Sequence, residues 1–123
     1  MLSEGRRVTS ARVPIRRCKT LADVRREIDR LDRRIVRLLS ERAGYVGEAA
    51  RIKERAAQIV DRARIEAVIE KVRDRSAAHG ADPDTIERIS RAMIDAFIAF
   101  ERRAFAKKKK TAARRPSRKT KAR

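Results

Sequence analysis

The sequence contains no tryptophan and only one cysteine, Cys18, among its 123 residues. A single cysteine excludes an internal disulfide and a cluster of cysteine metal ligands. Aromatic residues make up only 3% of the chain, so a hydrophobic core has to be built from aliphatic side chains. Glycine and proline are also scarce, whereas charged residues make up 42%. This composition, rich in alanine, arginine, glutamate, leucine and isoleucine, is typical of long helices and predicts an all-α fold.

Long apolar runs and familiar catalytic motifs are missing as well. No stretch approaches the roughly 18 apolar residues of a membrane span. The N-terminal segment lacks the apolar region of a secretory signal, although its arginines resemble those of an organelle-targeting segment. The motifs HExxH, CxxC, GxSxG and the phosphate-binding loop are absent, and the one histidine, His79, lies in a predicted turn. We expect a cytoplasmic protein that needs no metal or cofactor and does not bind membranes.

The net charge of +18 is unevenly distributed. Residues 1–20 contain six basic residues and one acidic residue, and residues 102–123 contain twelve basic residues and no acidic one. The part between them holds seventeen basic and sixteen acidic residues and is nearly neutral. The sequence therefore predicts one helical domain, residues 20–106, between two basic disordered segments, 1–19 and 107–123. These segments are suited to weak, non-specific contact with nucleic acid, but a dedicated nucleic-acid-binding protein would more often carry the excess charge on a folded face.

The first predicted helix begins after Thr20, which forms the pattern of a capping box with Asp23, and extends to about Arg55. Its length is roughly 50 Å at 1.5 Å per residue. Gly44 and Gly47 weaken it and indicate either a bend or a close packing contact. One face of the helix carries a row of apolar or small side chains, called the apolar seam below: Leu21, Val24, Ile28, Leu31, Ile35, Leu38, Tyr45, Ala49 and Ile52.

Two shorter helices follow, the second over residues 62–78 and the third from Pro83 to about residue 106. The turn between them places Gly80 as a C-terminal cap, and Asp82 caps the third helix. On the second helix Ile65, Val68, Ile69 and Val72 are expected to face inward. The third helix carries two neighbouring apolar stripes, one of Ile86, Ile89, Met93, Phe97 and Phe100 and one of Ile94, Ile98 and Phe105. Two short helices cannot cover a 50 Å seam along its full length, so we expect a homodimer that buries it.

Arg42 interrupts the apolar seam at a position where an apolar residue is expected. Lys53 follows eleven residues later, which returns its side chain to within about 20° of Arg42, roughly 16 Å further along. Because a buried unpaired charge costs several kcal/mol, both cations need partners. The pattern predicts either a grip on a small anion or a structural role, with an internal salt bridge, for example to Glu101 or Asp61, or with Arg42 extending to the surface.

Two further charged residues are candidates on weaker grounds. Arg25 lies seventeen residues before Arg42, about 25 Å away, so one helix cannot bring both to one ligand, whereas an antiparallel second copy can. The alternative is a solvated surface arginine. Glu101 adjoins the apolar face of the third helix, where burial disfavours the charged carboxylate, so that it could donate a hydrogen bond as the neutral acid. The alternative is a glutamate at a helix end that pairs with Arg102 or Arg103.

The segment LADVRREIDRLDRRIVRLLSERAGYVGEAARIK, Leu21 to Lys53, resembles the first helix of the all-helical chorismate mutases. Arg25, Arg42 and Lys53 fall on the three basic positions of that helix. The resemblance continues to Phe105 and covers about 85 residues. It implies an intertwined homodimer of three-helix protomers with two active sites, each of which takes its early arginine, here Arg25, from the partner chain.

The segments YVGEAARIK and HGADPDTIER, and the length of the loop after Lys53, are most similar to the branch that contains isochorismate pyruvate lyase. Arg64 falls on the arginine of the family's second helix, and Asp61 matches the loop aspartate of the mutases, although the loop is one residue shorter. Ile65 falls where typical mutases carry a glutamate that meets the substrate hydroxyl and where the lyases carry an apolar residue. Glu101 falls on a glutamine of most members, which some mutases replace by glutamate.

The resemblance implies the rearrangement of chorismate, a dicarboxylate, to prephenate. In the implied site Arg42 and the partner chain's Arg25 hold the carboxylates, and Lys53 and protonated Glu101 reach the ether oxygen. The implied apolar wall consists of Ala49, Ile94 and Ile98. A competing hypothesis is the lyase reaction that forms salicylate and pyruvate from isochorismate, which Ile65 favours. A basic helical protein that binds nucleic acid and a degenerate homologue with little activity are two further hypotheses.

Overall fold

The computed structural model describes residues 12–114, which are helical except at the connections and at the N-terminal segment 12–20. The elements are α2 (Leu21–Ile52), the short 3-10 helix η1 (Ala56–Gln58), α3 (Arg62–Ala78) and α4 (Pro83–Arg114). These described residues contain no strand, and the predicted all-α fold of three helices is confirmed. None of the helices is both long and apolar enough to cross a membrane.

The starts of the helices agree with the predictions. The hydroxyl of Thr20 accepts a hydrogen bond from the backbone N–H of Asp23, and the Asp23 carboxylate accepts one from the backbone N–H of Thr20, which completes a capping box. The N–H groups of Lys19 and Thr20 that donate to this carboxylate keep the pKa of Asp23 below its ordinary value. At the predicted turn Gly80 has φ +85°, a conformation that favours glycine, and α4 begins at Pro83.

Helix α2 ends three residues earlier than predicted, at Ile52 instead of about Arg55. Lys53 has an extended backbone, with φ −64° and ψ 139°, so the chain turns away from the helix axis there. The side-chain oxygen of Gln58 then accepts hydrogen bonds from the N–H groups of Glu54 and Arg55, each at 2.9 Å. Because those two donors are occupied by Gln58, they are not available to continue the helix.

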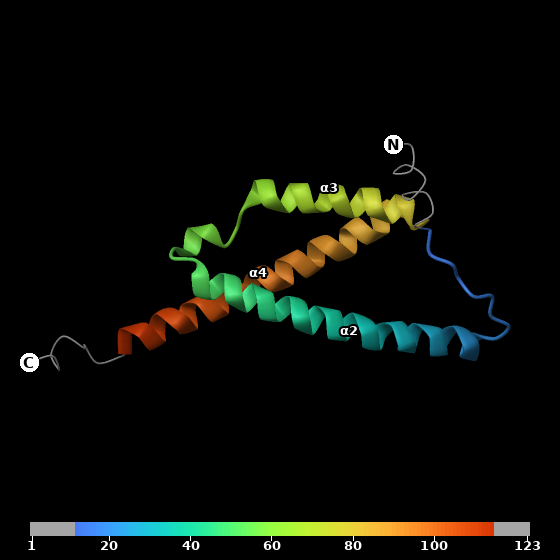
Figure 1. The fold of residues 1–123 in the computed structure, drawn as a ribbon, viewed down its shortest axis with the longest axis horizontal. Helices are drawn as coiled ribbons and strands as arrows, with labels where there is room; N and C mark the ends of the chain where they lie inside the picture. Colours follow the sequence, from blue (N-terminus) through green and yellow to red (C-terminus); the bar gives the residue numbers. More distant parts are fainter. Residues whose placement is uncertain (1–11, 115–123) are drawn as a thin grey trace, which may run out of the picture.

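Helix α4 runs diagonally across the molecule and contacts both other helices (Figure 1). Its N-terminal half lies along α3, and two arginines hold this pair together. Arg73 bonds to Asp84 and Glu87, and Arg91 bonds to Glu66 and Glu87. The hydrogen bonds from these two arginines lower the pKa of the Glu87 carboxyl, and the one from Arg91 has the larger effect. The two helices are thus joined by a continuous network of exposed and half-buried ion pairs.

The second half of α4 crosses the C-terminal end of α2, and a small hydrophobic core lies at this crossing. Its buried members are Ala50 of α2, Ile59 of the connection and Phe105 of α4, with Val60, Ile98 and Ala104 packed around them. Three segments that are far apart in the sequence therefore meet at one place. This crossing is also where the predicted site residues gather.

The apolar seam of α2 is largely uncovered, even near this crossing. Leu21, Ile28 and Leu31 are exposed at 68%, 50% and 43%, and Tyr45 and Ile52 at 69% and 65%. Helix α2 passes through Gly44 and Gly47, and a Cβ atom at either position would meet nothing within 4 Å, so the close packing contact is not found there in the single chain. Of the two predicted stripes on α4, the one with Ile94 and Phe105 contains buried residues, whereas Ile89 of the other is 60% exposed.

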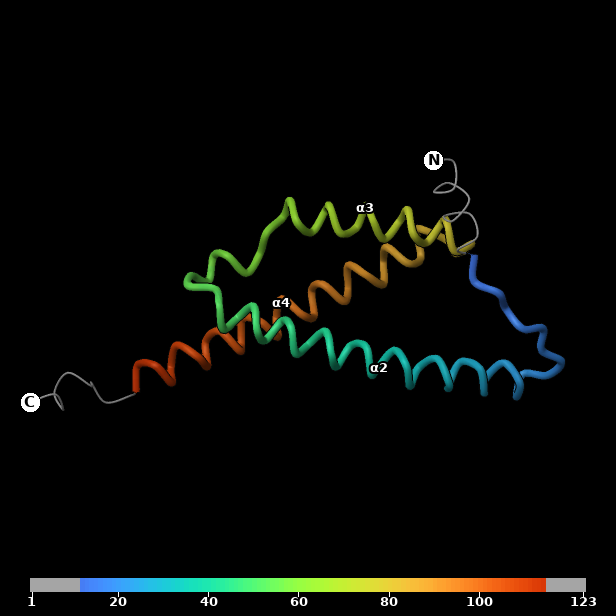
Figure 2. The backbone as a smooth tube through the Cα atoms, in the orientation of Figure 1, coloured from blue at the N-terminus to red at the C-terminus, as the bar shows by residue number. Residues whose placement is uncertain are grey.

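The predicted C-terminal boundary near residue 106 is too early. Helix α4 continues to Arg114, and the structure therefore contradicts the expected disorder for residues 107–114. The physical reason is a contact that the charge pattern did not suggest, in which Lys108 binds backbone carbonyls at the end of α2. At the other end, the N–H of Val13 donates to the carbonyl of His79, and the segment 12–20 runs from the turn between α3 and α4 to the start of α2 (Figure 2). The remaining parts of both predicted basic segments, 1–11 and 115–123, lie outside the described residues.

Candidate active site

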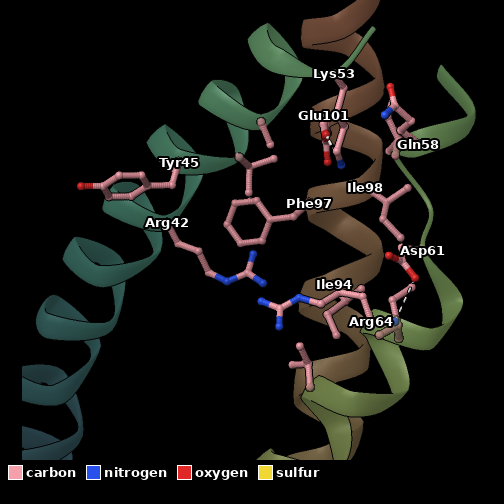
Figure 3. A pocket seen from close by; sticks show the side chains of 15 residues that line it. Arg42, Tyr45, Lys53, Gln58, Asp61, Arg64, Ile94, Phe97, Ile98 and Glu101 are labelled. Carbon is pink, nitrogen blue, oxygen red and sulfur yellow. Dashed lines mark hydrogen bonds and ion pairs between the residues drawn. The ribbon is translucent and has the colours of Figure 1, made fainter. Parts of the chain in front are cut away.

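A cavity of about 480 Å³ lies between α2, the connection after it, α3 and α4. This volume is in the range of small-molecule sites. Eight of the nine predicted site residues line it, and they come from all three helices and the connection (Figure 3). These eight residues are Arg42, Ala49, Lys53, Asp61, Arg64, Ile94, Ile98 and Glu101. The fold thus brings together residues that are up to 59 positions apart in the sequence.

Two guanidinium groups point into the cavity from opposite sides, Arg42 from α2 and Arg64 from α3 (Figure 3). Within residues 12–114 neither side chain forms an ion pair, so the salt bridges considered for Arg42, to Glu101 or Asp61, are not found. Arg42 instead stacks on Phe97, with its guanidinium carbon 4.6 Å from the ring centroid. Such a contact is worth about 0.5–1 kcal/mol, and a charge-assisted hydrogen bond about 1.5–3 kcal/mol. A carboxylate is therefore a better partner for Arg42 than the ring is.

The other end of the cavity holds an ion pair. The Nζ atom of Lys53 lies 2.8 Å from Oε2 of Glu101, and the two side chains are 26% and 8% exposed. The contact lacks the alignment of a hydrogen bond, and this buried oxygen has no hydrogen-bond partner elsewhere in the described chain. Lys53 therefore has the internal partner that a structural role requires. The pair still presents an ammonium group and an incompletely satisfied carboxylate to a molecule in the cavity.

The connection after α2 contributes two polar residues to the wall. Asp61 is the N-cap of α3, and its carboxylate accepts a hydrogen bond of 3.0 Å from the backbone N–H of Arg64. This cap fixes the first turn of α3 and with it the position from which Arg64 extends. Gln58 also lines the cavity, although its side-chain oxygen is used to hold the connection itself. Asp61 therefore has a structural task, while its place in the wall agrees with the prediction.

Several residues of the wall were not predicted as site residues. Phe97 was expected only to belong to an apolar stripe of the helix. It lies one helical turn before Glu101 on the same face of α4, and this spacing could have predicted that it lines the cavity too. Gln58 had no comparable signal, because it belongs to the irregular connection. Ile65 lies in the wall as an apolar side chain, beside Ile94 and Ile98.

Arg25 is the one predicted site residue that the single chain does not bring to the cavity. It lies exposed in the first turns of α2 and does not line the cavity. This is the arrangement expected if its place is in the site of a second copy, since α2 is too rigid to bend an arginine back along its own length.

The chain matches known proteins over most of the region described above. A family model described as chorismate mutase type II matches residues 24–102. A protein of Pseudomonas aeruginosa named isochorismate pyruvate lyase is 34% identical over 82 residues, which cover 67% of this chain and 81% of that protein. The region matched by the family model contains all nine predicted site residues.

Proposed function

The chain belongs to the chorismate mutase type II family, and on this premise we propose that it rearranges chorismate to prephenate. The observation that carries the proposal is the charge pattern of the cavity, in which two guanidinium groups without acidic partners in the described chain face an ammonium–carboxylate pair across an apolar wall. Chorismate is a dicarboxylate, and the guanidinium fork matches a carboxylate bidentately. The cavity therefore has cationic groups at both ends, where they can bind the negatively charged groups of the substrate.

The rearrangement is intramolecular. One carbon–oxygen bond of the ether breaks while one carbon–carbon bond forms, so no external nucleophile or electron carrier takes part. The protein has to hold the enolpyruvyl arm over the ring and stabilise the negative charge that develops on the ether oxygen. Arg42 and Arg64 hold one carboxylate between them, and the apolar side chains of Ile94 and Ile98 support the ring.

Lys53 and Glu101 act on the ether oxygen in this proposal. Lys53 has three N–H donors, so it can keep its contact with Glu101 and donate to the ether oxygen as well. Glu101 in its neutral form can donate a hydrogen bond to the same oxygen. The ammonium group of Lys53 is in place before the substrate arrives, and such a preorganised donor typically contributes about 10²–10³ in rate.

A homodimer completes the proposed site. The exposed seam of α2 would leave several large apolar side chains in water, and burying each of them fully is worth about 1.5–3 kcal/mol. If two copies of α2 cross antiparallel about a two-fold axis near Ile35, residue 25 of one copy lies opposite residue 45 of the other, within about one turn of Arg42. The partner's Arg25 would then hold the second carboxylate of the substrate.

A lyase reaction is the second candidate, supported by Ile65. This side chain is apolar and lies in the cavity wall, where a residue that binds the substrate hydroxyl is expected in a mutase. The relative named isochorismate pyruvate lyase points the same way. In that reaction the ether bond of isochorismate breaks as a ring hydrogen moves to the enolpyruvyl carbon, which forms salicylate and pyruvate at the same cationic site.

The purified full-length protein should be assayed with chorismate and with isochorismate, and the products identified by chromatography. We expect prephenate from chorismate. Salicylate and pyruvate from isochorismate, with no prephenate from chorismate, would make the protein a lyase. If neither substrate is turned over, the proposed function is wrong, and the chain is a family member without either activity.

A further inference from the structure

Lys108, in the part of α4 that the charge pattern assigned to a tail, contacts the end of α2. Its Nζ atom lies 2.8 Å from the carbonyl oxygen of Ala50, 3.1 Å from that of Arg51 and 2.7 Å from that of Lys53. The ammonium group also lies 4.7 Å from the centroid of the Phe105 ring. One lysine thus binds three backbone carbonyls of a segment that precedes it by 55 to 58 residues.

These contacts match the chemistry of a helix end. The last carbonyl groups of a helix have no partner within the helix, and together they form the negative end of its dipole. An ammonium group has three N–H donors and one positive charge, so it can satisfy three such carbonyls at once. Many helices end instead with a glycine in a left-handed conformation. Helix α2 has no glycine there, and Lys108 takes over this task from another element.

The position of the contact matters because one of the three carbonyls belongs to Lys53. The backbone of Lys53 is extended and leaves the helix at this residue, and its side chain reaches Glu101 in the cavity. From these contacts we infer that Lys108 is a positioning residue, which fixes the backbone of Lys53 so that its ammonium group meets the ether oxygen in the transition state. The catalytic part of this inference rests on the proposed function. The binding of Lys108 to the three carbonyls of α2, called the clamp below, can be tested without it.

The neighbouring lysines show that this role is specific to one position. Lys108 is half-buried, whereas Lys107, Lys109 and Lys110 are exposed. Lys110 has the same side chain on the same helix but faces solvent, and it forms no ion pair or hydrogen bond within the described chain. It is therefore the matched control.

The test compares Lys108→Met, Lys108→Arg and Lys110→Met in the full-length protein. Methionine keeps an unbranched side chain of similar length and removes the donors, and we expect Lys108→Met to lower kcat about tenfold with little change in KM, because a displaced donor weakens transition-state binding most. Lys108→Arg, which keeps a cationic donor, should recover most of the rate, and Lys110→Met should match the unmodified protein. A loss in Lys108→Met that appears in KM alone, or equally in Lys110→Met, would overturn the positioning role.

Hydrogen exchange of the Lys53 amide gives a second measurement that does not depend on activity. This N–H donates to the carbonyl of Ala49 at 2.9 Å and exchanges when the last turn of α2 opens. It should exchange faster in Lys108→Met than in Lys110→Met, while the amides in the middle of α3 keep their rates. Equal rates in the two variants contradict the clamp. If the unmodified protein converts neither substrate, the proposed function fails by itself, and the exchange rates still decide whether the clamp exists.

Discussion

The two ends of α2 differ in what packs against them. At the C-terminal end one face of the helix is covered, because Ala50 is only 2% exposed and Lys108 binds the last carbonyls, although the seam residues Tyr45 and Ile52 stay exposed at 69% and 65%. At the N-terminal end no residue of α2 is buried, and Leu21 is 68% exposed. A single chain therefore builds its core against one end of α2 only and leaves the seam open. The candidate site lies at the covered end, and the uncovered end is where we expect a second copy to bind.

The largest effect is expected at the covered end, from Lys53→Ala. Removing the ammonium group takes away a donor to the ether oxygen and should lower kcat by about 10²–10³. It also leaves the buried Glu101 without its ion-pair partner, which by itself costs up to about 3 kcal/mol of stability. Steady-state kinetics and thermal unfolding measure the two effects.

The double variant Lys53→Met with Glu101→Gln separates them, because it removes both charges of the buried pair. It should unfold at a temperature close to that of the unmodified protein and remain inactive. An active double variant, or a Lys53→Ala protein with an unchanged rate, would show that the site has been assigned to the wrong residues.

A complementation experiment tests whether residues from the two ends of α2 act in the same site. Arg25→Ala and Lys53→Ala should each be nearly inactive, since every proposed site uses Arg25 of one copy and Lys53 of the other. Co-expression of the two variants creates mixed dimers with one intact site, which should restore about a quarter of the unmodified activity. If the mixture is no more active than the separate variants, Arg25 does not act in the partner's site.

The uncovered end can be tested by charging the seam. Replacing both Ile28 and Ile35 with aspartate puts two carboxylates into the proposed dimer contact, and we expect the protein to become monomeric and to lose at least about tenfold in kcat/KM, because a lone chain lacks the partner's Arg25. Val36→Asp is the matched control, since Val36 is also exposed, at 61%, but lies off the seam. Analytical ultracentrifugation gives the oligomeric state. Dimers that persist in the double variant would contradict a contact along this seam.

The smallest of these effects concerns the proton on Glu101. If neutral Glu101 donates to the ether oxygen, the protonated form is the active one, so kcat should fall as the pH rises. Glu101→Gln keeps a donor at all pH values and should flatten the profile. A flat profile for the unmodified protein would mean that Glu101 acts as the ionised partner of Lys53 instead.

Much of this architecture could be predicted from local patterns. Helix starts depend on residues within one turn of each other, and the Thr20 and Asp23 capping box and the turn at Gly80 lie where they were predicted. The candidate site residues were proposed for a different reason, because the resemblance placed Arg42, Lys53, Arg64 and Glu101 on positions that the fold then brought to one cavity. Their convergence did not follow from periodicity alone, which left a structural role for Arg42 open.

The amino-acid sequence was sufficient to determine that there are three helices and where they begin, which face of α2 is apolar, and that a cation interrupts this face, since helix starts and periodicity are local properties of the chain. The tertiary structure was needed to decide that Lys53 pairs with Glu101 while Arg42 and Arg64 have no acidic partner in the described chain. It also decided where α2 ends and that α4 continues to Arg114. The pairing of Lys53 and the contacts of Lys108 join residues more than 45 positions apart, and no local pattern records which distant group will satisfy a given donor or acceptor.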